Sequence, residues 1–220
     1  MKRRKLIHNV TEFLFSLKKP HPVRVAIDGV DAAGKSILAN ELAESLRHVG
    51  RNVIRASIDG FHKPKKERYK RGTDSAEGYY YDSFDYNTLK KALLIPLGPG
   101  GNLQYNPAVF DYRTDSPIQE SMQLAQQDSI LLFDGVFLLR PELIEHWDYR
   151  IFVKVSFETV LQRVLLRDQH LFGSTEEVRN RYLKRYIPGQ KLYLKESKPE
   201  TNADIVIDNN DPSNPVIISP

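Results

Sequence analysis

The sequence of 220 residues contains no cysteine. This absence excludes a disulfide scaffold, a zinc–thiolate site and a cysteine nucleophile, and it agrees with the cytoplasmic location that we expect. Long apolar runs are also missing, since none approaches the ~18 residues that span a bilayer. The basic N-terminal stretch, residues 1–20, is interrupted by polar side chains and is followed by no small-residue cleavage site, so it lacks the pattern of a secretory signal. We expect no membrane partner.

A strong charge of one sign is lacking as well. The 32 Lys and Arg residues exceed the 28 Asp and Glu residues by only +4, and the excess is spread along the chain. This is too mild to indicate a nucleic-acid partner, whereas a basic cleft for a phosphorylated metabolite would fit it. The 40% of hydrophobic and 27% of charged residues are ordinary for one globular domain.

Five short apolar runs predict β-strands, at residues 23–28, 53–59, 130–134, 150–155 and 205–208. Several are almost uninterrupted, the pattern of strands buried on both faces of a parallel sheet. Apolar spacing predicts helices between them, at residues 35–49, 86–94, 158–170 and 175–194. The alternation of strands and helices indicates the α/β class.

Two further segments bear on domain organisation. We expect residues 1–22 to form a helical extension packed on the outside, with a membrane-surface role as its alternative, and residues 23–220 to form one domain. Residues 98–116 are rich in Gly, Pro and Asn and predict a long connection that carries one strand or hairpin.

Residues 29–36, GVDAAGKS, match the phosphate-loop pattern G-x-x-x-x-G-K-[ST] once. The motif follows a predicted strand and begins a predicted helix, which is the context it requires. Glycines let successive backbone N–H groups turn toward a phosphate, and the helix N-terminus adds partial positive charge. We therefore predict that the chain binds a nucleoside triphosphate. The predicted binding residues are Gly29, Asp31, Ala32, Ala33, Gly34, Lys35 and Ser36.

Three carboxylates end apolar runs and precede glycine, namely Asp28, Asp59 and Asp134. Ligands of open parallel sheets bind beyond the carboxyl ends of the strands, so the three groups would converge on the phosphate end. Asp-Gly is also a plain turn signal, the interpretation that we favour for Asp28. Asp134 fits the acid that holds Mg²⁺ together with the Ser36 hydroxyl, while Lys35 reaches the β- and γ-phosphates.

Asp59 is the candidate base. An acceptor hydroxyl needs a carboxylate within hydrogen-bond reach that takes its proton and orients it for in-line attack. Asp59 leads into an irregular segment, residues 60–64, that could present an acceptor, and we place His62 on the substrate side.

With these motifs in hand, residues 23–210 resemble the uridine kinase and phosphoribulokinase family of P-loop kinases. Besides the phosphate loop, the likeness comprises, in chain order, SIDGFHKP (57–64), YYYDSFD (79–85), PAVFDYRTD (107–115), LLFDGVFLLRPEL (131–143), RIFVKVSFETVLQRVLLRD (150–168) and TNADIVIDN (201–209). The resemblance implies a P-loop NTPase three-layer sandwich, with a five-stranded parallel core sheet of order 2-3-1-4-5. It also implies a helical lid near residues 170–190.

The resemblance further implies the reaction, transfer of the γ-phosphoryl group of ATP to the 5′-hydroxyl of uridine or cytidine with Mg²⁺. Asp59 matches the catalytic aspartate of the family. Arg167 matches an arginine that contacts the phosphates, although a solvated helix face is its alternative. Asp82 matches the acid that holds the ribose hydroxyls, or it caps a helix that starts near residue 86. Tyr112 and Arg113 fall where the family binds the acceptor.

Two departures concern the acceptor. Arg163, whose role we leave open, is followed by Val164 where the family often has a second arginine, and Asp115 stands where we expect a base-contacting histidine. A third departure, Asp134 in place of the usual Glu, keeps the same chemistry. The first two weaken the case for uridine without weakening the case for a kinase.

Other functions stay open. SIDGFHKP followed by Arg71-Gly72 also resembles bacterial pantothenate kinases, so the acceptor could be pantothenate or another riboside. An ATP-binding regulator without catalysis is disfavoured, because a sensor has no need of a base on the acceptor side. We expect a small-molecule partner, and the family resemblance leaves a homo-oligomer open.

Overall fold

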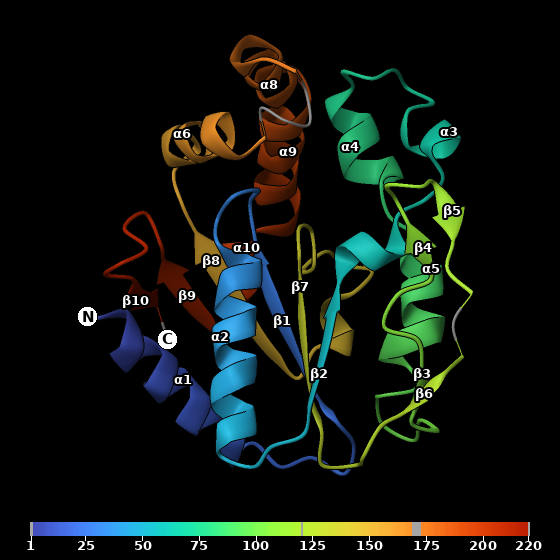
Figure 1. The fold of residues 1–220 in the computed structure, drawn as a ribbon, viewed down its shortest axis with the longest axis vertical. Helices are drawn as coiled ribbons and strands as arrows, with labels where there is room; N and C mark the ends of the chain where they lie inside the picture. The colour runs from blue at the N-terminus through green and yellow to red at the C-terminus, as the bar shows by residue number, and fades with distance from the viewer. Residues whose placement is uncertain (1, 120, 169–172, 220) are drawn as a thin grey trace.

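The computed structural model describes residues 2–119, 121–168 and 173–219. Its middle layer is a sheet of order β10-β9-β8-β1-β7-β2 (Figure 1). Five strands run parallel, and β10 pairs antiparallel with β9 at one edge. The strands are β1 (Val23–Gly29), β2 (Val53–Ser57), β7 (Ile130–Gly135), β8 (Tyr149–Lys154), β9 (Ile205–Asp208) and β10 (Val216–Ser219).

We predicted a sheet of five strands, but the sheet has a sixth strand, β10, at its edge. The strand count and the full order therefore differ from the prediction. The five parallel strands themselves follow the order β2-β7-β1-β8-β9. The run of residues 216–218 was too short to stand out in the sequence. It forms a strand because the edge of β9 offers backbone N–H and C=O groups that need partners.

The predicted helices are present with altered ends. Residues 86–94 form α5 followed by a π-helical segment, and residues 175–194 are divided between α8, a second π-helical segment and α9. The helix predicted to reach residue 170 is α6, and residues 169 and 170 lie outside the described part. The helices are α1 (Arg3–Ser16), α2 (Lys35–His48), α3 (Lys65–Arg68), α4 (Ala76–Asp82), α5 (Tyr86–Leu89), α6 (Phe157–Arg167), α8 (Thr175–Arg181), α9 (Ile187–Ser197) and α10 (Pro199–Asn202).

The predicted connection 98–116 contains short strands that form antiparallel pairs. β3 (Gln104–Tyr105) pairs with β6 (Gln123–Leu124), and β4 (Phe110–Asp111) pairs with β5 (Ser116–Pro117). The predicted strand 53–59 ends at Ser57, because the chain turns there into a 3₁₀ helix, Ile58–Phe61.

Two apolar layers cover the sheet. Alternate residues of a strand point to opposite faces, so Val25 and Ile27 face the layer of α1 and α2 while Ala26 faces the layer of α4, α5 and α9. Leu6 and Leu14 of α1 are fully buried in the first layer, against α2. No described helix is long and apolar enough to cross a membrane.

The turn from β1 into α2 requires glycine at two points. A Cβ on Gly29 would lie 2.4 Å from the carbonyl oxygen of Val153, so only glycine permits this approach of β1 to β8. Gly34 has φ +93° and leads directly into Lys35, the first residue of α2. This turn places the phosphate loop at the carboxyl end of β1, beside α9 (Figure 1).

Candidate active site

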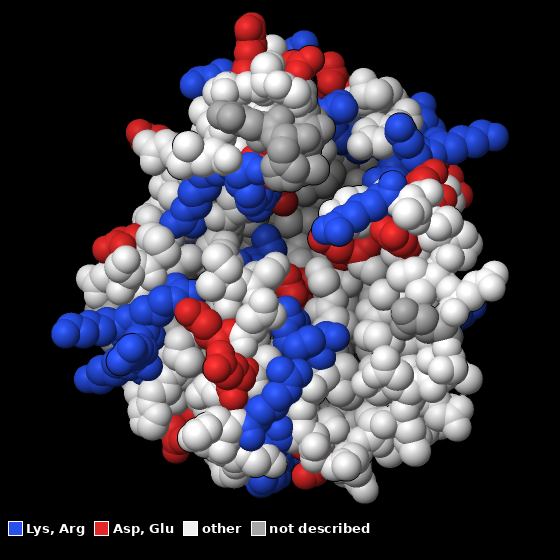
Figure 2. Space-filling view, in the orientation of Figure 1, with Lys and Arg blue, Asp and Glu red and all other residues white. Residues whose placement is uncertain are grey.

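A cavity of about 700 Å³ opens at the carboxyl ends of β2 and β7 and beside the phosphate loop. Figure 2 shows the surface hollowed between the upper helices and the rest of the molecule, with basic and acidic side chains at the edge of the hollow. Most of the predicted site residues meet here. Those that line it are Asp31, Ala32, Lys35, Ser36, Asp59, His62, Tyr112, Arg113, Asp134 and Arg167.

Four predicted residues are absent from this lining. Gly29, Ala33 and Gly34 lie in the phosphate loop beside it, whereas Asp82 lies elsewhere. Asp28 is also buried away from it, where the Tyr193 hydroxyl and the Leu138 N–H donate to its carboxylate. Burial raises the pKa of Asp28 to about 6. Asp28 therefore does not join Asp59 and Asp134 in the cavity, in agreement with the non-catalytic interpretation that we favoured, and its carboxylate is a hydrogen-bonded part of the core near the end of β1.

Lys35 is held within the phosphate loop. Its ammonium donates to the carbonyl oxygen of Val30 at 2.7 Å. Burial lowers the pKa of Lys35, and the neighbouring carboxylates of Asp31 and Asp28 oppose that shift. A buried cation at the opening of a helix suits a polyphosphate ligand.

Ser36 and Asp134 lie side by side, as a shared Mg²⁺ ligand pair requires. The Ser36 hydroxyl donates to Asp134 Oδ2 at 2.5 Å, and Asp134 is 3% exposed. A hydroxyl and a carboxylate are the hard oxygen ligands that Mg²⁺ takes in phosphoryl-transfer sites. The residues present therefore fit the ion.

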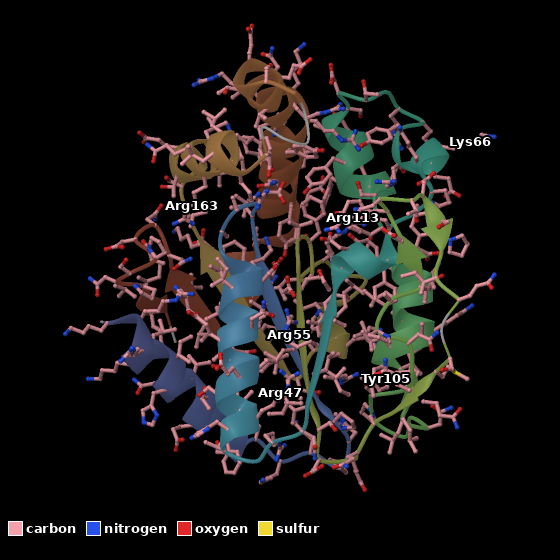
Figure 3. The ribbon with its side chains drawn as sticks, viewed as in Figure 1. Arg47, Arg55, Lys66, Tyr105, Arg113 and Arg163 are labelled. Carbon is pink, nitrogen blue, oxygen red and sulfur yellow. The ribbon has the colours of Figure 1, made fainter. Side chains whose placement is uncertain are left out.

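Arg55 completes this group, and sequence reasoning missed it. Its guanidinium donates to Asp134 Oδ1 at 2.7 Å and to the Leu132 carbonyl oxygen at 2.5 Å. In Figure 3 its side chain lies between α2 and β2. Arg55 therefore compensates the charge of the buried Asp134 carboxylate from the strand edge.

We expect Arg55→Met to lower the free energy of unfolding by about 2 kcal/mol, because it leaves the buried Asp134 without its cation. Urea denaturation measures the change. The matched control is Arg150→Met, whose ion pair with Asp204 is 2.8 Å long but has side chains 31% and 30% exposed. That change should cost less than ~1 kcal/mol. Equal losses in the two variants would mean that burial of Asp134 does not set the strength of its pair.

Asp59 lies at the start of the 3₁₀ helix after β2, facing the phosphate loop across the cavity. Burial raises the pKa of its carboxyl, as does the charge of Asp134, while Lys35 opposes the shift. His62 follows one turn later, and its ring lies 3.0 Å from the Asp59 carbonyl oxygen through Nδ1. Burial lowers the pKa of His62 to about 4, so its imidazole is neutral near pH 7.

The acceptor end of the cavity is aromatic. The His62 ring packs against Phe84 at 4.6 Å and Tyr112 at 4.9 Å between ring centroids. The Arg113 guanidinium lies 5.8 Å from the Tyr112 ring. These groups offer a stacking surface and a hydrogen-bond donor to a planar or polar acceptor.

Asp82 is not brought to this end. Its carboxylate pairs with Lys70 at 3.0 Å and with Arg71 at 2.7 Å. The alternative role as a helix cap is wrong, because Asp85 accepts from the Thr88 N–H at 2.9 Å and caps α5. The side chains of Lys70 and Arg71 therefore pair with the carboxylate that the resemblance assigned to the ribose hydroxyls.

The arginines of α6 have different surroundings. Arg167 lines the cavity, bonds both carboxylate oxygens of Asp168 at 2.6 and 2.9 Å, and donates to the Tyr182 hydroxyl. Arg163 instead donates to the backbone oxygens of Ala32 and Asn209. Figure 3 shows Arg113 and Arg163 on opposite sides of the loop between β1 and α2.

The expected lid, residues 170–190, is described only from residue 173. There Arg185, 2% exposed, donates to the Ser75 carbonyl oxygen at 2.9 Å, and Arg181 donates to that of Thr73 at 2.6 Å. These arginines join the end of α8 and the segment after it to the residues just before α4. Tyr79 of α4 and Gln190 of α9, which sequence reasoning missed, both hydrogen-bond to Asp31.

Comparison with known proteins agrees with this geometry. The model of the phosphoribulokinase / uridine kinase family matches residues 25–213. Uridine-cytidine kinase B from Dictyostelium discoideum is 26% identical over 189 residues, which cover 85% of this chain and 74% of that protein. A uridine kinase from Clostridium botulinum is 29% identical over 195 residues, which cover 84% and 87%.

The fold is shared with a solved structure. That of a possible uridine kinase from Bacillus stearothermophilus has a TM-score of 0.73 and 22% identity, and the match covers 92% of this chain and 97% of that one. Since the family match spans nearly the whole chain, including the phosphate loop and the cavity, this chain belongs to the phosphoribulokinase / uridine kinase family and is a phosphotransferase that acts on a hydroxyl group.

Proposed function

We propose that the chain transfers the γ-phosphoryl group of ATP to the 5′-hydroxyl of uridine or cytidine. The observation that carries the proposal is the position of Asp59, which lines the same cavity as Lys35 and the Ser36–Asp134 pair. The pyrimidine nucleoside is supported by the named activity of the relatives and by the aromatic acceptor end. We further propose a helical extension at residues 1–22 and one kinase domain, 23–220, with its lid near 170–190.

The donor side holds the phosphates. The Lys35 ammonium and the backbone N–H groups of residues 29–36, apart from that of Asp31, bind the β- and γ-phosphates. Ser36 and Asp134 would hold Mg²⁺, which would neutralise charge on the transferred group. Arg167 contributes a further positive charge beside the transferred phosphoryl group.

The acceptor side supplies the nucleophile. Asp59 accepts the proton of the acceptor hydroxyl while that oxygen forms a bond to the γ-phosphorus, and the bond from this phosphorus to the β–γ bridging oxygen breaks to release ADP. The raised pKa of Asp59 suits it to this role, because a raised pKa makes the carboxylate a stronger base. His62, Tyr112 and Arg113 hold the acceptor, with the neutral His62 ring and Tyr112 as the stacking surface.

A second candidate is a kinase for another hydroxylated metabolite, such as pantothenate or a different riboside. Two observations favour it. Asp82 is engaged by Lys70 and Arg71, and Asp115, which stands where we expected a histidine, accepts from the Lys65 N–H and from Arg68.

An acceptor panel in a coupled ADP-release assay with Mg²⁺-ATP tests the proposal. It contains uridine, cytidine, other ribosides, pantothenate and a control without acceptor. We expect uridine or cytidine to raise ADP release at least ~10-fold above that control, since open-site hydrolysis is slow without an acceptor. Turnover only with another acceptor would replace the substrate and keep the mechanism. ATP binding without any acceptor-dependent turnover would favour a regulator.

A further inference from the structure

The carboxylate of Asp31 is not explained by phosphate binding. Asp31 is the third residue of the phosphate loop, which binds anions. Its negatively charged carboxylate would repel the phosphates of a bound nucleotide. Even its backbone N–H is engaged, by Gln190 Oε1 at 3.2 Å. The side chain lines the cavity, so its role must be sought there.

Two buried groups fix the direction of this carboxylate. The Gln190 amide donates to Asp31 Oδ2 at 2.6 Å, and the Tyr79 hydroxyl donates to the same oxygen at 3.1 Å. Gln190 is 0% and Tyr79 7% exposed. Within the part of the chain that the structure describes, no donor bonds Oδ1, although a carboxylate oxygen accepts up to two hydrogen bonds.

The other acids of the cavity are already engaged. Among the described residues that line it, Asp134 is bound by Ser36 and Arg55, and Asp168 by Arg167 and Tyr182. Asp59 is the proposed base. Asp31 is therefore the carboxylate that remains for recognition.

We propose that Asp31 Oδ1 accepts a hydrogen bond from an acceptor hydroxyl other than the one that reacts, so that the enzyme selects polyhydroxylated acceptors. This inference rests on the proposed function. A hydroxyl suits the place, because it gives the carboxylate a donor without adding negative charge near the phosphates. It also supplies the role that the engaged Asp82 does not fill.

The test combines Asp31→Asn with deoxy analogues of uridine. Wild-type enzyme should lose at least ~10-fold in kcat/KM with either 2′-deoxyuridine or 3′-deoxyuridine, the loss expected when a hydroxyl bonded to a charged group is removed. Asp31→Asn should lose a similar factor on uridine, show less than ~3-fold further loss on that analogue, and keep the KM for ATP within ~3-fold.

A purely structural role for Asp31 predicts other results. The KM for ATP would then change as much as that for the acceptor, or the variant would discriminate the deoxy analogues as strongly as the wild type, and either result overturns the proposal. So does loss of discrimination in Asp82→Asn but not in Asp31→Asn.

A second variant and a second acceptor cover two cases in which the first experiment cannot be carried out as described. If Asp31→Asn fails to fold, Tyr79→Phe removes only a donor to Oδ2. It should raise the acceptor KM about 3-fold at an unchanged KM for ATP, and equal changes in both would contradict the proposal. If wild-type enzyme turns over pantothenate and not uridine, the nucleoside proposal fails, and the analogue of pantothenate without its second hydroxyl replaces the deoxyuridines.

Discussion

Replacement of Asp59 by asparagine is expected to lower kcat at least ~10²-fold, the contribution of a positioned general base. Asparagine keeps the size of the side chain and lacks the group that takes the acceptor proton. Because Asp59 lies opposite the phosphate loop, the KM for ATP should stay within ~3-fold. Steady-state kinetics with the best acceptor of the panel measures both quantities.

Asp128→Asn is the matched control. Asp128 is exposed and precedes β7, at the opposite end of that strand from the cavity. Its substitution should leave kcat unchanged, and circular dichroism should show the same fold in both variants. Turnover of Asp59→Asn near the wild-type value would remove Asp59 from the role of base.

The pH dependence of the reaction follows from the same carboxylate. Asp59 must be ionised to accept a proton, so kcat/KM should fall as the pH falls through its pKa. Burial raises that pKa above the ordinary value of 3.8, and the charge of Asp134 adds to the shift, so the acid limb should lie above pH 3.8. Asp59→Asn should lack this limb in its residual activity. A wild-type profile that is flat down to pH 4 would contradict the assignment.

Local signals predicted the parts of the site that are contiguous in the chain. The phosphate loop needs only eight residues between a strand and a helix, and the acids Asp59 and Asp134 stand directly after apolar runs. Parallel strands bring their carboxyl ends to one edge, so the convergence of these groups followed from the α/β pattern. The cavity at this edge agrees with that reasoning.

The rest depends on contacts between distant residues. Arg55 reaches Asp134 across 79 positions of sequence, and Gln190 reaches Asp31 across 159. The residues that surround Arg55 or Gln190 in the sequence do not indicate which distant residue each will contact. Asp82 shows the opposite case. Its motif matched a known role, but Lys70 and Arg71, which lie 12 and 11 positions earlier in the chain, form ion pairs with its carboxylate.

Replacement of Lys35 by alanine is expected to lower kcat/KM for ATP at least ~10²-fold, because it removes the cation that contacts the β- and γ-phosphates. Its ammonium is 2.7 Å from the Val30 carbonyl oxygen, held at the loop where these phosphates bind. Equilibrium binding of a nonhydrolysable ATP analogue, measured by calorimetry, should weaken in parallel. Lys5→Ala, on the exposed side of α1, is the matched control.

The Lys35 and Asp59 variants together separate the two sides of the cavity. Lys35→Ala should impair ATP binding whether or not an acceptor is present, whereas Asp59→Asn should impair turnover with ATP binding preserved. If both variants weakened ATP binding equally, Asp59 would act through the phosphate loop, since its carboxylate and the Lys35 ammonium interact across the cavity. Preserved ATP binding in Asp59→Asn alone therefore distinguishes a base that faces the acceptor from a group that only supports Lys35.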